Sequence, residues 1–231
     1  MPSSVRGIDS MVQQRSWESY QSFALHGGLD RFTKIFARYE LFKKAIDIPG
    51  DIVEGGVYRG AGVLYWAKLI QIFNPLSIRR VIGFDTFEGF PKTAKLDYDR
   101  ETGAMLTQQD SYFKEVSPDG IMQIAASLDL DHRIELVKGD ARNTIKDYVR
   151  GNPGFRIALL NLDFDTGDAT AAALEQLYSL VVPRGVIVFD EYAIRGWGES
   201  EAVDKFFEDK HVVYESLSWT LTPTAYILKE A

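Results

Sequence analysis

The sequence has 231 residues, a length that suits one α/β domain with a proper core. Its 26 Lys and Arg residues and 33 Asp and Glu residues give a formal net charge of −7, whereas a nucleic-acid-binding surface needs a basic stripe. Cysteine is absent, which excludes disulfides, thiol nucleophiles and thiolate metal sites. The N-terminal part has no apolar signal-peptide core, and no apolar run approaches the ~18 residues of a membrane span. We therefore expect a cytoplasmic protein that binds neither nucleic acid nor membrane.

Two regions are predicted along the chain. Residues 1–28 are polar for most of their length, and we expect a mobile arm or, alternatively, a segment that docks on a partner or acts as a lid. The domain itself is expected over 29–231. It begins with a helix over 29–46, because apolar residues recur there at three- and four-residue steps and Pro49-Gly50 ends the pattern.

A glycine-rich turn follows the first predicted strand. The β-prone pair Ile52-Val53 leads into Glu54, four glycines follow up to Gly62, and a helix is predicted over 63–73. A strand, a glycine turn and a helix are typical of a nucleotide-binding α/β unit. A carboxylate at Glu54 would repel a pyrophosphate, but it could accept from the α-ammonium of S-adenosyl-L-methionine. The alternative is a glycine turn that merely closes a βα unit.

Acids follow several further strands. Asp85 is suited to accept from ribose hydroxyls, although it could simply cap a helix, and Asp140 could accept from an adenine amino group. The long connection over about 86–119 is expected to form a lid, since such connections in compact domains are usually functional or disordered. Strands are predicted over 80–85, 134–137, 157–162, 185–189, 212–214 and 225–228, the last two antiparallel.

The predicted strands over 157–162 and 185–189 end in paired acids. Asp163 and Asp165 follow the first of them, and Asp190 and Glu191 follow the second. Neighbouring parallel strands bring their carboxyl ends together, and crowded carboxylates repel one another unless they are protonated or bridged by a cation. Mg²⁺ prefers such oxygen ligands, so a metal site is predicted. Helix caps and solvent-facing acids remain the alternative.

Four motifs carry a resemblance to a known family. They are Glu-Gly-Gly-Val-Tyr-Arg-Gly at 54–60, Gly-Phe-Asp-Thr-Phe-Glu-Gly-Phe-Pro at 83–91, Leu-Asp-Phe-Asp at 162–165 and Val-Phe-Asp-Glu-Tyr at 188–192. With these motifs, the chain resembles the macrocin O-methyltransferases, which are Mg²⁺-dependent sugar O-methyltransferases of antibiotic pathways. The resemblance implies a Rossmann-like class I methyltransferase fold. We expect a mostly parallel, seven-stranded sheet with helices on both faces and one antiparallel terminal strand.

The resemblance also implies roles for individual residues. Asp165 would be the catalytic base, and Asp163, Asp190 and Glu191 would hold the metal. The family usually has Asp where Glu191 stands, and the loop over 166–170 also departs from its pattern, so the acceptor is expected to differ from the characterised sugars. S-adenosyl-L-methionine would be bound by Glu54, Gly55, Gly56, Val57, Tyr58, Arg59, Asp85, Thr86, Phe87, Gly139, Asp140, Ala141 and Asp163.

The expected function is therefore S-adenosylmethionine- and metal-dependent O-methylation of a sugar or glycosylated small molecule. Because the loop over 166–170 is altered, a catalytically silent scaffold of the same fold is the alternative. A nicotinamide-dependent oxidoreductase is disfavoured by the glycine spacing. The resemblance further implies a homodimer or higher homo-oligomer, with the helix over 29–46 as candidate interface. His26, His132 and His211 lie in no motif and are expected to be structural or exposed.

Overall fold

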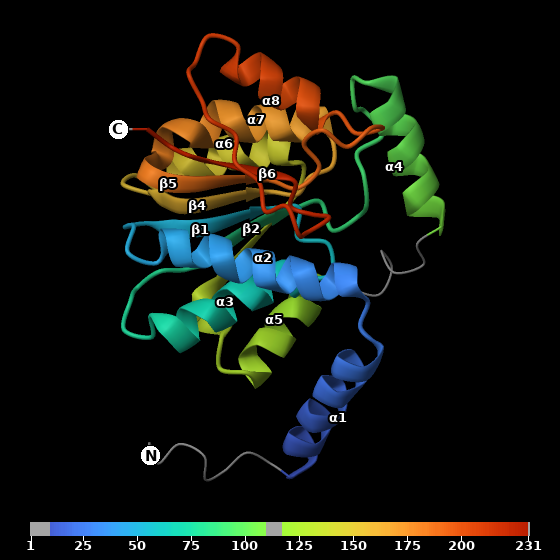
Figure 1. The fold of residues 1–231 in the computed structure, drawn as a ribbon, viewed down its shortest axis with the longest axis vertical. Helices are drawn as coiled ribbons and strands as arrows, with labels where there is room; N and C mark the ends of the chain where they lie inside the picture. The colour runs from blue at the N-terminus through green and yellow to red at the C-terminus, as the bar shows by residue number, and fades with distance from the viewer. Residues whose placement is uncertain (1–9, 110–116, 231) are drawn as a thin grey trace.

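The computed structural model describes residues 10–109 and 117–230, which contain one mixed sheet (Figure 1). Its strand order is β3-β2-β1-β4-β5-β6, with the first five strands parallel and β6 antiparallel to β5. This confirms the predicted α/β class. The strands span Asp51–Gly55 (β1), Val81–Asp85 (β2), Ile134–Lys138 (β3), Ile157–Leu162 (β4), Val181–Phe189 (β5) and Ala225–Leu228 (β6).

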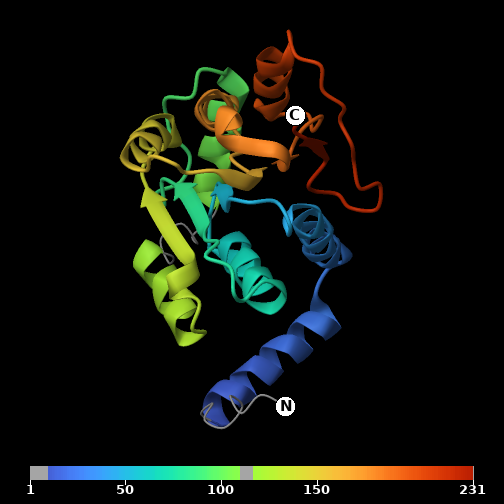
Figure 2. The same ribbon diagram turned by 90° about the vertical axis from the view of Figure 1, so that its left-hand side faces the viewer.

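Helices cover both faces of the sheet, as Figures 1 and 2 show. On one face lie α2, α3 and α5, and on the other lie α6, α7 and α8. Helix α4 stands beside the sheet, and α1 projects away from the body of the molecule. The helices span Ser10–His26 (α1), Leu29–Ala45 (α2), Ala61–Phe73 (α3), Asp97–Gln109 (α4), Pro118–Ser127 (α5), Ala141–Gly151 (α6), Gly167–Leu177 (α7) and Glu199–Phe207 (α8).

The central strand β4 explains why both faces are covered. All six of its residues are buried, because it lies between β1 and β5 and carries helices above and below. Leu160 and Leu162 pack into the core under α6, α7 and α8, while Leu159 packs into the opposite core with Phe42 and Trp66. Burial on both faces is the reason that this strand is a continuous apolar run rather than an alternating one.

Three segments differ from the simplest expectation. The sheet has six strands within the described residues and not seven, because the segment 212–214 forms no ladder. Glu215 makes a single bridge with Tyr226, and the Tyr214 ring stacks on Tyr192 with ring centroids 4.9 Å apart, so side-chain packing holds the segment.

The predicted lid region contains α4, although 110–116 lie outside the described residues. The N-terminal arm likewise contains α1, and residues 1–9 lie outside the description.

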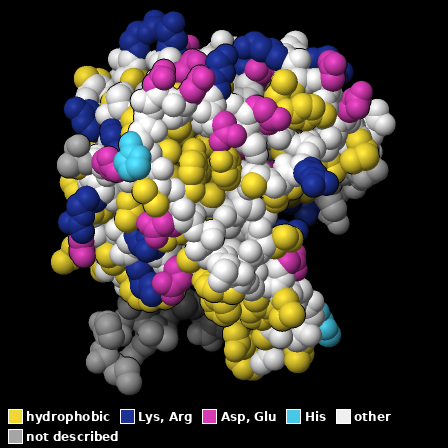
Figure 3. All heavy atoms as spheres, turned by 45° about the horizontal axis from the view of Figure 1, so that its top comes forward, with side chains coloured by type: hydrophobic (Ala, Val, Ile, Leu, Met, Phe, Trp, Pro, Cys, Tyr) yellow, Lys and Arg dark blue, Asp and Glu magenta, His cyan; other side chains and the backbone are white. Residues whose placement is uncertain are grey.

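The surface carries both signs of charge. Figure 3 shows Lys, Arg, Asp and Glu side chains interspersed over the face that it displays, with hydrophobic groups between them. Among the described helices, none combines the length and the apolar content that a bilayer crossing requires.

Candidate active site

The register of the parallel strands places two acids side by side. Leu162 of β4 pairs with Phe189 of β5, so the next residues, Asp163 and Asp190, lie opposite each other. The pairing continues past the strand ends, because the Asp190 N–H donates to the Leu162 carbonyl at 3.0 Å. Residues in register on neighbouring strands point to the same face of a sheet. The two carboxylates therefore converge, as expected of parallel neighbours.

Two further carboxylates complete what we call the acidic cluster, namely Asp163, Asp165, Asp190 and Glu191. Oxygens of Asp163, Asp190 and Glu191 all lie within 4.8 Å of one another. Asp165 forms a hydrogen bond with Glu191 and adopts a left-handed backbone with φ of 64°, a region that Asp tolerates better than most residues. The Glu191 Oε2 atom is buried and has no hydrogen-bond partner among the described residues, so it could still bind a cation.

Helix α2 supplies cations to this cluster. The Lys34 Nζ atom lies 2.7 Å from Asp190 Oδ2 and 3.2 Å from Asp163 Oδ2. One turn further along, an Arg38 guanidinium nitrogen lies 3.2 Å from Glu54 Oε1 and 3.5 Å from Asp163 Oδ2. The helix that precedes β1 is therefore part of the site as well as part of the core.

Burial dominates the electrostatics of the cluster. It raises the pKa of Asp165 to about 7 and holds the pKa of Asp163 well above its usual range, with the neighbouring carboxylate of Asp190 acting in the same direction on both. The pKa of Glu191 is also raised, first by burial and then by Asp165. A carboxyl with a pKa near neutrality is suited to exchange a proton at physiological pH.

A second layer of the site lies behind Glu191. The Glu199 side chain at the start of α8 is fully buried, and its Oε1 atom accepts from the Glu191 N–H at 3.0 Å. Burial raises the pKa of Glu199 well above its usual range, with Asp190 as the next cause. Glu199 thus fixes the backbone that carries Glu191.

The glycine turn is shaped by close packing against this cluster. A Cβ atom at Gly56, whose φ is 85°, would lie 1.8 Å from the Asp163 carbonyl oxygen, and one at Gly55 would lie 2.3 Å from the Phe164 ring. A Cβ at Gly62 would lie 1.8 Å from Glu54 Oε1. The absence of side chains brings the ends of β1 and β4 into contact and leaves room for Glu54 beneath the first turn of α3.

Glu54 lies almost completely buried among protein donors. Its carboxylate accepts from Trp66 Nε1 at 2.5 Å and from Asn161 Nδ2 at 3.1 Å, in addition to Arg38. Burial raises its pKa, and Arg38 acts against that rise. Contact between Glu54 and the amino group of a cofactor stays a prediction.

Asp85 organises the residues around the next strand end. Its Oδ2 atom accepts from the backbone N–H groups of Val57 and Tyr58, each at 2.8 Å, and its Oδ1 atom accepts from the Phe87 N–H at 2.7 Å. The predicted cofactor residues over 55–59 and 85–87 are therefore held together by this one carboxylate. A role of Asp85 toward ribose stays a prediction.

Asp140 lies apart from the acidic cluster, after the edge strand β3. It caps α6 by accepting from the Arg142 N–H at 3.0 Å, and its carboxylate pairs with the Arg142 guanidinium at 2.5 Å. The hydrogen bond from Arg142 lowers the Asp140 pKa. Gly139 joins this region to β2, since its N–H donates to the Asp85 carbonyl at 2.8 Å. Asp140 is thus the N-cap of α6, and contact with adenine stays a prediction for Asp140 and Ala141.

The lid region is anchored on the loops that carry the acids. Asp99 of α4 is 1% exposed and accepts from the backbone N–H groups of Gly167 and Gly198, both at 2.8 Å. The two glycines pack backbone to backbone, because a Cβ at Gly167 would lie 2.5 Å from the Gly198 carbonyl oxygen. A second anchor is the bond from the Lys95 N–H to Asp168 Oδ2 at 2.7 Å.

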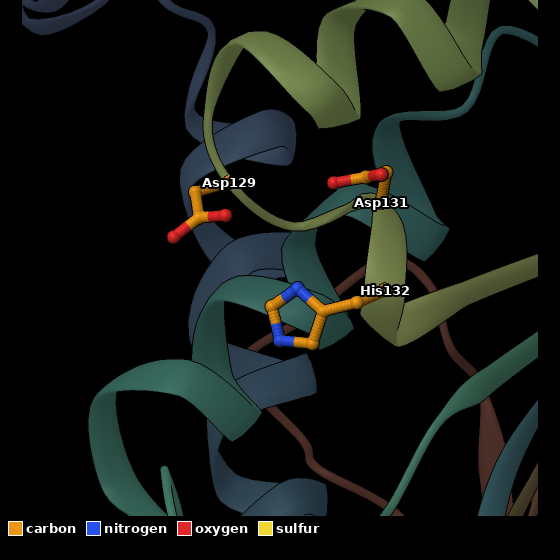
Figure 4. A group of neighbouring side chains, drawn as sticks. All are labelled: Asp129, Asp131 and His132. Carbon is orange, nitrogen blue, oxygen red and sulfur yellow. The ribbon is translucent and has the colours of Figure 1, made fainter.

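Another group of possible metal ligands lies elsewhere. Asp129, Asp131 and His132 come from the turn between α5 and β3, as Figure 4 shows. All three are exposed, as was expected for His132. They lie apart from the strand ends that carry the acidic cluster.

Several residues of the site escaped the sequence interpretation. Lys34, Arg38 and Asp99 reach the site from helices that have no sequence motif, and only the finished packing shows their partners. Asn161 had a signal, because it is the polar residue in the apolar run of β4, and it is buried against Glu54.

Sheet order, glycine turn and antiparallel last strand together define the class I methyltransferase fold. The chain is similar over 96% of its length to a crystal structure of the calicheamicin methyltransferase CalS11, with a TM-score of 0.75, 25% identity and 94% of that chain covered. The O-methyltransferase NovP shares the fold, with a TM-score of 0.72, 23% identity and coverage of 88% of this chain and 81% of that chain.

Family membership follows from the sequence comparison. Residues 28–226 match the macrocin-O-methyltransferase (TylF) family, and the chain belongs to it. It is 30% identical over 156 residues to the 8-demethyl-8-(2,3-dimethoxy-alpha-L-rhamnosyl)-tetracenomycin-C 4'-O-methyltransferase of Streptomyces olivaceus, covering 64% of this chain and 54% of that protein. Mycinamicin III 3''-O-methyltransferase of Micromonospora griseorubida is 27% identical over 175 residues, with coverage of 74% and 65%. The chain thus matches between about half and two thirds of the length of these curated relatives.

Proposed function

We propose that this protein transfers a methyl group from S-adenosyl-L-methionine to a hydroxyl of a sugar or glycosylated small molecule. The observation that carries the proposal is the acidic cluster beside the glycine turn, in a chain that belongs to the macrocin-O-methyltransferase family. The names of the curated relatives support the substrate class, since they describe O-methylation of glycosylated compounds.

The acidic cluster fits a divalent cation. Its three convergent carboxylates have oxygens within 4.8 Å of one another, and in the part of the chain that the structure describes the buried Glu191 Oε2 atom lacks a hydrogen-bond partner. Hard oxygen donors of this kind suit Mg²⁺, which Asp163, Asp190 and Glu191 would hold. When bound, the ion would supply positive charge that lowers the pKa of an acceptor hydroxyl.

The chemical step needs a base near the acceptor. A sugar hydroxyl is a poor nucleophile because its pKa lies far above 7. In the proposed step the hydroxyl oxygen attacks the sulfonium methyl carbon, the carbon–sulfur bond breaks to leave a neutral thioether, and the Asp165 carboxylate takes the hydroxyl proton. Holding the oxygen in line with the methyl group supplies the positional part of the rate enhancement.

The cofactor is proposed to lie along the glycine turn. Asp85 holds the backbone of Val57, Tyr58 and Phe87, so the protein's own hydrogen bonds organise the turn. Preorganisation of this kind lowers the entropic cost of binding. The remaining predicted cofactor residues, from Glu54 to Asp163, are proposed on the family resemblance.

Exposed apolar side chains on the first two helices support a homo-oligomer. Leu29 of α2 is 83% exposed and Trp17 of α1 is 62% exposed. Exposed apolar groups that gather on one part of a surface are typical of interaction sites. We propose a homodimer or larger homo-oligomer, which light scattering coupled to size exclusion would test.

The decisive experiment is a transfer assay with methyl-labelled S-adenosylmethionine. A panel of nucleotide sugars and glycosides is incubated with the full chain, and products are detected by the mass of one added methyl group. Calorimetry with S-adenosylmethionine, with and without Mg²⁺, runs in parallel. Labelled product supports the enzyme. Cofactor binding that never leads to product and is independent of Mg²⁺ would favour the silent scaffold.

A further inference from the structure

The Lys34 ammonium group occupies a defined position inside the acidic cluster. It bridges Asp190 and Asp163, at 2.7 Å and 3.2 Å, and both carboxylates belong to the triad that fits a metal ion. Together with Arg38, whose guanidinium lies 3.5 Å from Asp163 Oδ2, this ammonium already neutralises part of the charge that a divalent ion would neutralise. The third carboxylate, Glu191, forms a hydrogen bond with Asp165, but its buried Oε2 atom has no hydrogen-bond partner within residues 10–109 and 117–230.

We propose that Lys34 is a built-in competitor of the divalent cation. Its ammonium holds Asp163 and Asp190 together when no ion is bound, and it leaves when an ion binds, because two cations in one small cluster repel each other. The inference rests on the metal requirement of the proposed function. It adds that the helix before β1 sets how tightly the ion binds.

The side chain can leave without disturbing the helix. Lys34 is 19% exposed in its side chain, so part of that side chain borders on solvent, and its four-carbon stem is flexible. The backbone around it is fixed independently. Arg38 remains paired with Glu54, the Tyr65 hydroxyl donates to the Ile35 carbonyl at 2.9 Å, and Phe42 is fully buried.

Competition has a quantitative consequence. The apparent dissociation constant of a ligand equals its intrinsic constant divided by the fraction of molecules that are competent to bind. If Lys34 fills the cluster in about nine of ten molecules, removing its charge should tighten metal binding about tenfold.

The test compares two variants on the same helix. Lys34→Met removes the charge and keeps the stem, whereas Lys43→Met removes an exposed lysine that pairs with Glu40. Binding of Mn²⁺ alone to the full chain is measured by calorimetry. We expect the dissociation constant to fall about tenfold for Lys34→Met and to stay unchanged for Lys43→Met.

Stability gives an independent readout. Without metal, Lys34→Met should melt at a lower temperature than the wild type, because the carboxylates lose their bridging cation. Saturating Mn²⁺ should then raise its melting temperature more than it raises that of the wild type. Lys34→Gln keeps a neutral hydrogen-bond donor and provides a milder variant should Lys34→Met fail to fold.

The outcomes separate the inference from the proposed function. Equal or weaker Mn²⁺ binding by both Lys34 variants, with normal binding by the wild type, overturns the competition and leaves the metal requirement standing. Absence of Mn²⁺ binding by the wild type and by both Lys34 variants overturns the competition and the metal requirement together.

Discussion

Acids follow four of the parallel strands, and they fall into two contrasting sets. Asp85 and Asp140 each bind donors close to them in the chain or in the adjoining glycine turn. Asp85 accepts mainly from backbone N–H groups, and Asp140 accepts from the backbone N–H and the guanidinium of Arg142. The acids after β4 and β5 instead lie against one another, and their cations come from the distant helix α2.

The difference shows how two acids that follow parallel strands come to have different pKa values. At Asp140, a hydrogen-bonded arginine lowers the carboxyl pKa, so the group stays ionised and holds a loop. At Asp165, burial raises the pKa to about 7, so the group can exchange a proton. The same residue type after two parallel strands thus acquires a different pKa, because burial dominates at one and a hydrogen-bonded cation at the other.

The largest expected effect is on the acidic cluster, where removal of the proposed divalent cation should stop methyl transfer. Exhaustive chelation is expected to abolish methyl transfer, and added Mg²⁺ should restore it, because Asp163, Asp190 and Glu191 are proposed to hold the ion. Transfer rates before chelation, after chelation and after readdition provide the measurement. Full activity in the chelated protein would exclude the metal.

Within the acidic cluster, a change at Asp165 is expected to lower the rate of methyl transfer and to leave cofactor binding unchanged. Asp165→Asn removes the proton acceptor and should slow turnover by about 10²- to 10⁴-fold. Binding of S-adenosylmethionine, measured by calorimetry, should be unchanged. A variant that transfers methyl groups at the wild-type rate would remove Asp165 from the role of base.

Asp99 in the predicted lid tests whether the loops that follow the acidic cluster are held in place by α4. Asp99→Ala leaves the buried N–H groups of Gly167 and Gly198 without an acceptor and should cost about 3 kcal/mol of folding free energy. Urea unfolding measures the loss. The control Asp97→Ala changes an exposed acid on the same helix, and its effect should stay within about 0.5 kcal/mol. Similar values for the two variants would refute the anchoring role.

A change at Asp140, whose partner Arg142 is close in the chain, should give the smallest effect on stability. Asp140→Ala removes a helix cap and should cost about 1 kcal/mol at pH 7. Because the folded pKa of Asp140 is lowered, its contribution is present above about pH 4 and is lost as the pH falls through the folded pKa. Urea unfolding at pH 7 and pH 3 checks this. The exposed Asp147→Ala on the same helix is the matched control.

Sequence reasoning worked where partners are close in the chain or fixed by strand direction. The apolar run over 157–162 predicted a buried parallel strand, and parallel direction alone predicted that Asp163 and Asp190 would meet. These features depend on local periodicity and on the geometry of parallel sheets.

Sequence reasoning failed where tertiary packing decides which residues contact each other. Lys34 and Arg38 lie on a helix whose pattern shows how it packs but not which carboxylates its charges meet. The segment 212–214 has β-prone residues, yet Val213 is 61% exposed and the backbone forms no ladder there. Helix α4 could not be predicted from the sequence because its residues are mostly polar. Its anchor, Asp99, accepts from the N–H groups of two glycines that are distant in the chain.

The backbone contact between Gly167 and Gly198 limits how the protein can be engineered. Even one methyl group at either position would force the two loops apart. The hydrogen bonds from the Gly167 and Gly198 N–H groups to Asp99 would then break. Libraries aimed at new acceptors should therefore leave these two positions untouched and vary the side chains around them.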